Sequence, residues 1–267
     1  MMIEKRMFGK TGFEVSRIGI SSSFGANSAV YEEAFERGCN YFTWGTFIKG
    51  RSTEFKGFIK HMVTAGKREK LFIGVLSYSH SAFLGNRFLI SALRQLGLEY
   101  IDGLILGYYS KKPSKSIVDW ALELKRQGTV RAIGLTTHNR SVVVPLAQEG
   151  ILDFFHIRYN AVHRGAEYDI FPYIEEMAPG LVTFTATSWR QLLAQKKMPP
   201  GISAPRAADC YRYVLSRPEV DVCMMGVRNK EMLRDNLQAI EKAPMTPEEL
   251  EKMKMIGDHL YGKPRVT

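Results

Sequence analysis

The stretch Leu71-Phe72-Ile73-Gly74-Val75-Leu76 is a short apolar run of the length and composition that predict a buried strand. Seven other runs share this character, so eight strands are predicted. The seven are Ile18–Ser21, Tyr41–Thr43, Gly103–Leu106, Ala132–Leu135, Phe154–Arg158, Leu181–Thr185 and Val222–Met225. Amphipathic stretches separate the runs. This alternation favours a parallel sheet whose strands are joined by crossover helices.

The clearest of the predicted helices spans Ser114–Gln127, and Gly128 follows it where a glycine commonly ends a helix. Four apolar residues recur there at helical spacing and share one face: Ile117, Trp120, Ala121 and Leu124. An open, doubly wound sheet would show the same alternation of strands and helices. No GxGxxG motif follows the first predicted strand, however, so the dinucleotide-binding form of that fold loses support.

Length and composition are those of a globular protein. The chain has 267 residues, and one α/β barrel typically needs about 250. Hydrophobic residues make up 45% and charged residues 24%, both of which are ordinary values. No linker, low-complexity tract or internal repeat divides the sequence. We therefore expect residues 1–267 to form a single domain.

The cysteines and the N-terminus indicate in which cellular compartment the protein is expected. Cys39, Cys210 and Cys223 are far apart and odd in number, which argues against a disulfide framework or a zinc site and suits a reducing compartment. The N-terminal residues lack an apolar signal core, and no run approaches 18 apolar residues. We expect a cytoplasmic protein with no metal site and no membrane association.

The net charge of +10 raises the question of nucleic-acid binding. The basic residues are scattered in short pairs, such as Lys67-Arg68 and Lys111-Lys112, and do not form one stripe with interleaved aromatic residues. We therefore expect no nucleic-acid partner. A general positive field still favours small anionic ligands, among them a phosphorylated dinucleotide.

Several segments, in one order along the chain, resemble the aldo-keto reductase family. Arg6–Gly19 is similar to its opening hairpin, Lys125–Gly134 to its turn into strand five, and Gly226–Asn229 to its cofactor-phosphate segment after strand eight. Asn40–Gly45 and Tyr100–Gly107 are similar to its second and fourth strands, with Leu71–Leu76 as the third. The resemblance implies a (β/α)8 TIM barrel with an N-terminal β-hairpin that caps the barrel bottom.

The same resemblance locates the family's catalytic Asp, Tyr, Lys and His, and all four are replaced here. Their positions hold Thr43, Ile48, Leu76 and Gly107, or Phe47 if the loop after the second strand aligns one place earlier. Leucine, isoleucine and phenylalanine cannot donate a proton, glycine has no side chain, and threonine cannot replace a carboxylate. The resemblance therefore implies that the family's usual mechanism is lost.

Polar residues near the predicted strand ends are candidates for a relocated proton donor. Tyr108 directly follows the position of the lost His, and His80 follows the third strand. A histidine without a shifted pKa titrates near neutral pH, which suits proton transfer. The alternative for both residues is a partly exposed place in a loop, with no catalytic role.

The resemblance also implies a cofactor site for NADP(H), with seven candidate residues: Thr136, Thr137, His156, Phe184, Arg228, Asn229 and Asn236. The two threonines and His156 stand where the family binds the nicotinamide carboxamide, and Phe184 stands where a Tyr stacks on the nicotinamide. Arg228 and Asn229 lie where the phosphates are expected, and Asn236 where adenine is contacted. A guanidinium suits phosphate, which favours NADP(H) over NAD(H). An exposed arginine at a helix start is the alternative for Arg228.

Three functions stay open at this point. The first is an NADP(H)-dependent oxidoreductase with substituted donors, acting on a carbonyl or another hydride acceptor. The second is a catalytically silent barrel that binds NADP(H) or another metabolite. The third is a purely structural subunit. The chain is short for the family it resembles, and an open mouth would suit a bulky partner or a site completed in an oligomer.

Overall fold

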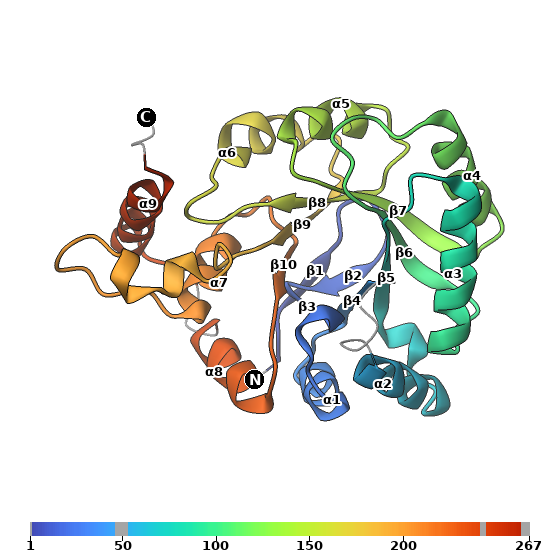
Figure 1. Ribbon diagram of the computed structural model, residues 1–267, viewed down its shortest axis with the longest axis horizontal. Helices are drawn as coiled ribbons and strands as arrows, with labels where there is room; N and C mark the ends of the chain where they lie inside the picture. The colour runs from blue at the N-terminus through green and yellow to red at the C-terminus, as the bar shows by residue number, and fades with distance from the viewer. Residues whose placement is uncertain (1, 46–52, 241–243, 263–267) are drawn as a thin grey trace.

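The computed structural model describes residues 2–45, 53–240 and 244–262. Across these ranges eight parallel strands close into a barrel in the order β10-β3-β4-β5-β6-β7-β8-β9, with helices around it (Figure 1). The strands are β3 (Ile18–Ser21), β4 (Tyr41–Gly45), β5 (Phe72–Ser77), β6 (Ile101–Leu106), β7 (Val130–Thr137), β8 (Phe154–Arg158), β9 (Gly180–Phe184) and β10 (Val222–Met225). The predicted (β/α)8 class is confirmed.

Helices cover the outside of this barrel. They are α1 (Ser28–Glu36), α2 (Thr53–Thr64), α3 (Ala82–Leu96), α4 (Lys115–Arg126), α5 (Val143–Gln148), α6 (Ala166–Asp169), α7 (Ala207–Leu215), α8 (Lys230–Ile240) and α9 (Pro247–Tyr261). The predicted amphipathic helix is α4, which buries Ile117, Ala121 and Leu124. Gly128 after it has φ 76°, the left-handed conformation that a glycine adopts without strain.

A separate two-stranded hairpin precedes the barrel, as predicted. β1 (Lys5–Met7) pairs antiparallel with β2 (Glu14–Ser16). The side chain of Phe8 enters the barrel from this hairpin, and its ring centroid lies 5.6 Å from Tyr41, 5.5 Å from Phe72 and 5.2 Å from Phe154. The hairpin therefore closes the end of the barrel where the strands begin.

Successive residues of each strand face opposite sides, which separates two cores. One core lies between strands and helices, and the smaller one fills the barrel and includes Tyr41, Phe72, Ile105 and Phe154. A Cβ added at Gly134 would lie only 2.2 Å from a ring carbon of Phe154. The phenylalanine ring thus occupies the space that a side chain on β7 would need.

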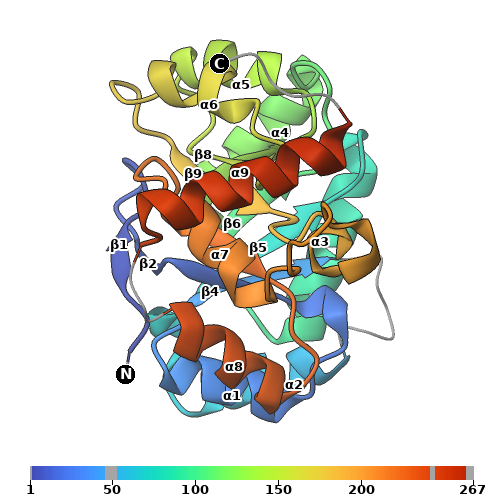
Figure 2. The ribbon, with the colours of Figure 1, turned by 90° about the vertical axis from the view of Figure 1, so that its left-hand side faces the viewer.

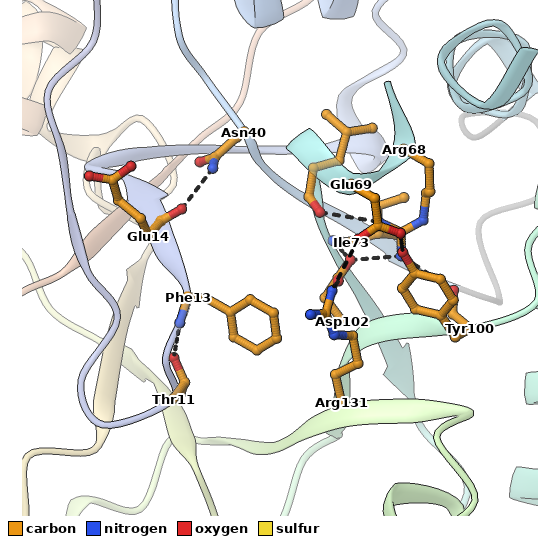
Figure 3. Close-up of polar contacts among 11 residues, drawn as sticks. Thr11, Phe13, Glu14, Asn40, Arg68, Glu69, Ile73, Tyr100, Asp102 and Arg131 are labelled. Atoms are coloured by element: carbon orange, nitrogen blue, oxygen red, sulfur yellow. Dashed lines mark hydrogen bonds and ion pairs between the residues drawn. The ribbon is translucent and has the colours of Figure 1, made fainter. Parts of the chain in front are cut away.

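A buried ion cluster joins β5, β6 and β7 near their starts. Asp102 is fully buried, and its Oδ2 accepts hydrogen bonds from Arg68 Nη2 at 2.8 Å and from the Ile73 amide at 2.8 Å. Its Oδ1 lies 3.2 Å from Arg131 Nη1 (Figure 3). The figure also shows Asn40, at the start of β4, donating to the Glu14 carbonyl of the hairpin at 2.8 Å.

The last helix crosses the barrel side where α7 and α8 lie (Figure 2). Arg164, in the loop after β8, donates from Nη1 to the Lys254 carbonyl at 3.0 Å and from Nη2 to Asp258 Oδ1 at 2.7 Å. These contacts hold α9 against the loop that follows β8. No helix in the described part of the chain combines the length and apolarity that crossing a bilayer requires.

Candidate functional site

A cavity of about 670 Å³ opens at the carboxyl ends of the barrel strands. Side chains from the strands form its inner wall, among them Thr43 of β4, Leu76 of β5, Thr136 of β7 and His156 of β8. Active sites of (β/α)8 enzymes lie at this end of the barrel. The volume is within the range of about 300–1,000 Å³ that is usual for small-molecule and cofactor sites.

The lining of the cavity is positively charged. Its described side chains include Arg190 and Arg228 but no Asp or Glu. Burial and nearby Arg158 lower the pKa of His138, and burial lowers the pKa of His156 to about 3. Both histidines are therefore neutral near pH 7, and the two arginines set the sign of the field. This field favours an anionic ligand.

Three of the four positions that the resemblance assigns to the family's catalytic Asp, Tyr, Lys and His are described, and none of them carries an ionisable group. Thr43 and Leu76 line the cavity, Thr43 being almost fully buried. Gly107 directly follows β6, and a Cβ there would lie 2.8 Å from a ring carbon of Tyr78 and 2.9 Å from the Ser77 carbonyl oxygen. Position 107 therefore has no room for a side chain. Ile48 and Phe47 lie outside the described residues.

Tyr108, the first candidate donor, lines the cavity with 62% of its surface exposed. Its ring stacks on Tyr78, with centroids 5.1 Å apart, and lies parallel to His138 at 6.3 Å. Its φ of 58° is unusual for a residue other than glycine. This conformation turns the chain sharply after Gly107.

His80, the second candidate, is exposed and is not among the side chains that line the cavity. Its Nε2 is 3.1 Å from the Gly107 carbonyl oxygen, and its ring stacks on Tyr109 at 4.2 Å. His80 thus lies beside the segment that follows β6. The structure does not bring it together with Tyr108 in the cavity.

Five of the seven candidate cofactor residues meet in this one cavity: Thr136, His156, Phe184, Arg228 and Asn236. Thr137 faces the other way, and its hydroxyl group bonds to the backbone of Asn139. Asn229 is exposed and accepts a hydrogen bond from the Met232 amide at 2.8 Å, so its side chain caps the start of α8. Neither of these two residues is part of the lining.

One cluster of lining residues has no counterpart among the predicted residues. Trp189 and Arg190 follow β9, and both line the cavity. They and Thr185 have positive φ values of 50°, 67° and 61°. Backbone strain of this kind costs about 1–3 kcal/mol per residue and tends to gather at functional sites. No glycine marks this turn in the sequence, so sequence patterns gave no signal for it.

His156 forms a hydrogen bond deep in the barrel. Its Nε2 lies 2.8 Å from the hydroxyl oxygen of Tyr41, and both side chains are buried. Burial raises the pKa of Tyr41 well above its ordinary value and lowers that of His156 to about 3. Both partners are therefore neutral from mildly acidic to neutral pH.

The lowered pKa predicts an acid-sensitive contribution to stability. Below pH 6.5 an unfolded chain protonates His156, whereas the folded chain does not until about pH 3, so stability is lost as the pH falls through this window. We expect urea unfolding at pH 6.5 and 4.5 to show an extra loss of about 2 kcal/mol in the native protein relative to His156→Gln. Parallel pH profiles for the two proteins would contradict this prediction.

Comparison with known proteins identifies the fold. No family model and no curated protein matches the sequence. The structure is similar to the holo form of aldo-keto reductase AKR11C1 from Bacillus halodurans, with a TM-score of 0.80, 19% identity, and coverage of 99% of this chain and 98% of that one. The apo form of the same enzyme gives a TM-score of 0.77 and 20% identity at the same coverage. Nearly the whole chain therefore has the aldo-keto reductase fold.

Proposed function

We propose that this chain is an NADP(H)-dependent oxidoreductase of the aldo-keto reductase type with a non-standard active site. The observation that carries the proposal is the cavity at the strand ends, where five candidate cofactor residues converge. Folds of this class support many chemistries at that end of the barrel, because the loops supply the reacting groups.

The lining fits a phosphorylated nicotinamide dinucleotide in three respects. Arg228 and Arg190 supply cations for phosphate groups, and no described carboxylate opposes them. The ring of Phe184 offers an apolar face against which a nicotinamide can stack. Thr136 and His156 bring hydrogen-bonding groups to the inner wall for a carboxamide.

The reaction divides between the cofactor and the chain. NADPH, when bound, supplies the hydride. Tyr108, at the edge of the cavity, gives a proton to the oxygen where negative charge develops. Thr43, on the inner wall, can donate a hydrogen bond to the same oxygen. Apolar groups such as Leu76 and Phe184 keep water from the reacting atoms.

NADPH oxidation in a panel of carbonyl compounds and quinones tests the proposal. We expect one class of acceptor to accelerate NADPH consumption, followed by the loss of its absorbance, above the rate without protein. If NADPH binds and no acceptor is reduced, the proposed activity is wrong.

A catalytically silent barrel that binds NADP(H) or another anionic metabolite is the second candidate. The observation that favours it is the loss of ionisable side chains at three described tetrad positions, Thr43, Leu76 and Gly107. Such a protein would bind NADPH but show no hydride transfer in the panel. A purely structural subunit would bind neither nucleotide.

A further inference from the structure

Tyr41, which pairs with His156 deep in the barrel, has no role in the function proposed above. Tyr41 belongs to the apolar cluster inside the barrel and stacks on Phe72 with ring centroids 4.7 Å apart. Within the described part of the chain, the hydroxyl group of Tyr41 has one hydrogen-bond partner, Nε2 of His156. His156 in turn lines the cavity, so the pair links the barrel interior to the ligand site.

The environment of Tyr41 decides which atom donates. A phenol has one proton to give, and the apolar cluster around Tyr41 offers it no acceptor other than Nε2 of His156. In the reverse arrangement, with Nε2–H donating to the tyrosine oxygen, the hydroxyl hydrogen would stay buried without a partner. Leaving a buried donor unsatisfied is costly, whereas the first arrangement satisfies both groups. Nε2 is therefore the acceptor.

The other ring nitrogen then carries the hydrogen. Burial keeps the imidazole neutral, and a neutral imidazole with an unprotonated Nε2 has its proton on Nδ1. Nδ1 makes no hydrogen bond to another described residue, and it is not one of the fully buried nitrogens that lack a partner. Since His156 lines the cavity, this N–H group is available to a ligand there.

We propose that Tyr41 is a positioning residue that fixes His156 as an Nδ1–H donor toward the cavity, where it binds a carbonyl-type oxygen of the ligand. The inference deepens the proposed function and rests on it for the identity of that oxygen, the carboxamide oxygen of the nicotinamide. The assignment of the tautomer rests on the protein alone.

The first test is the tautomer of His156 in the free protein. In ¹⁵N-histidine-labelled protein, correlations between ring protons and ring nitrogens distinguish Nδ1–H from Nε2–H, and the signals that vanish in His156→Gln belong to His156. We expect a pure Nδ1–H pattern that does not change between pH 5 and 8. An Nε2–H pattern, a mixture, or titration near neutral pH in the native protein would overturn the inference without any variant.

The second test removes the tyrosine hydroxyl group. In Tyr41→Phe we expect His156 to lose its single-tautomer pattern. Tyr31→Phe is the matched control, because it also removes a buried hydroxyl group, one that has no hydrogen-bond partner among the described residues. The control should leave the signals of His156 unchanged. An unaltered pattern in Tyr41→Phe would show that the tyrosine does not set the tautomer.

The third test separates the nicotinamide end of the ligand from the phosphate end. We expect Tyr41→Phe to weaken NADPH about three- to tenfold and to leave adenosine 2′,5′-bisphosphate, which lacks nicotinamide, unchanged. Equal weakening of both would mean that Tyr41 acts through the fold, which overturns the inference. If neither ligand binds the native protein, the proposed function and the carboxamide acceptor both fail, while the tautomer still decides the role of Tyr41.

Discussion

Replacing Tyr108 by phenylalanine is expected to slow hydride transfer about 100- to 10,000-fold, the usual effect of losing a general acid. Tyr108 lines the cavity and directly follows Gly107, where no side chain fits. Its neighbour Tyr78 is a poorer proton donor than an ordinary tyrosine, because burial and Tyr108 raise the pKa of Tyr78 to about 12. The measurement is the single-turnover rate of NADPH oxidation with the best acceptor from the panel.

Two further measurements show whether the slower rate comes from the loss of proton transfer by Tyr108. NADPH affinity should be nearly unchanged in Tyr108→Phe, since the residue is assigned to proton transfer. Tyr168→Phe removes the hydroxyl group of another exposed tyrosine, on α6 and outside the cavity lining, and should leave the rate unaltered. A Tyr108→Phe protein that turns over at the native rate would exclude Tyr108 as the donor.

Replacing Asp102 by alanine is expected to lower the free energy of unfolding by about 3–5 kcal/mol, as is typical when one partner of a buried ion pair is removed. Asp102 is fully buried, and the substitution leaves the buried guanidinium of Arg68 without its carboxylate. It also removes the acceptor of the Ile73 amide. The cluster in Figure 3 therefore stabilises three adjacent strands at once.

Urea unfolding at pH 7 measures this effect. Asp119→Ala is the matched control, because Asp119 pairs with Lys115 at 2.7 Å on the exposed surface of α4, and it should cost no more than about 0.5 kcal/mol. Asp102→Asn keeps an oxygen for the Ile73 amide and should fall between the two. A loss below about 1 kcal/mol in Asp102→Ala would mean that the cluster contributes little.

Much of the fold could be predicted from local patterns. Each apolar run became a strand, and the limits moved by a few residues only: β7 begins at Val130 where Ala132 was expected. The hairpin, which the resemblance to the aldo-keto reductases implied, is also present. The end of α4 at Gly128 was predicted correctly, because a glycine after an amphipathic helix is a local signal. These features depend on residues that are near one another in sequence.

The site was less predictable, because it depends on the direction in which side chains point and on contacts between residues that are far apart in the sequence. Alternation along β7 was a usable signal, since it puts only one of Thr136 and Thr137 inside the barrel. The hydrogen bond between Tyr41 and His156 joins residues 115 positions apart, so no local sequence pattern predicts it. Trp189 and Arg190 reach the cavity through left-handed backbone that their residue types do not favour.

The central claim is that the cavity at the strand ends binds NADP(H), and calorimetric titration with NADPH and NADH tests it most directly. Arg228 is an exposed cation in the lining, and charge-assisted hydrogen bonds to a phosphate are strong. We expect micromolar binding with a preference for NADPH, and a loss of about 10- to 100-fold in NADPH affinity in Arg228→Ala with little change for NADH. Arg87→Ala, which removes one positive charge from α3, serves as the control.

The account predicts that the preference for NADPH disappears together with the guanidinium of Arg228 and survives in the control. Quenching of Trp189, which lines the same cavity, should follow the calorimetric isotherm. If neither nucleotide binds the native protein, or if both bind equally and Arg228→Ala changes nothing, the account of this cavity as an NADP(H) site is contradicted.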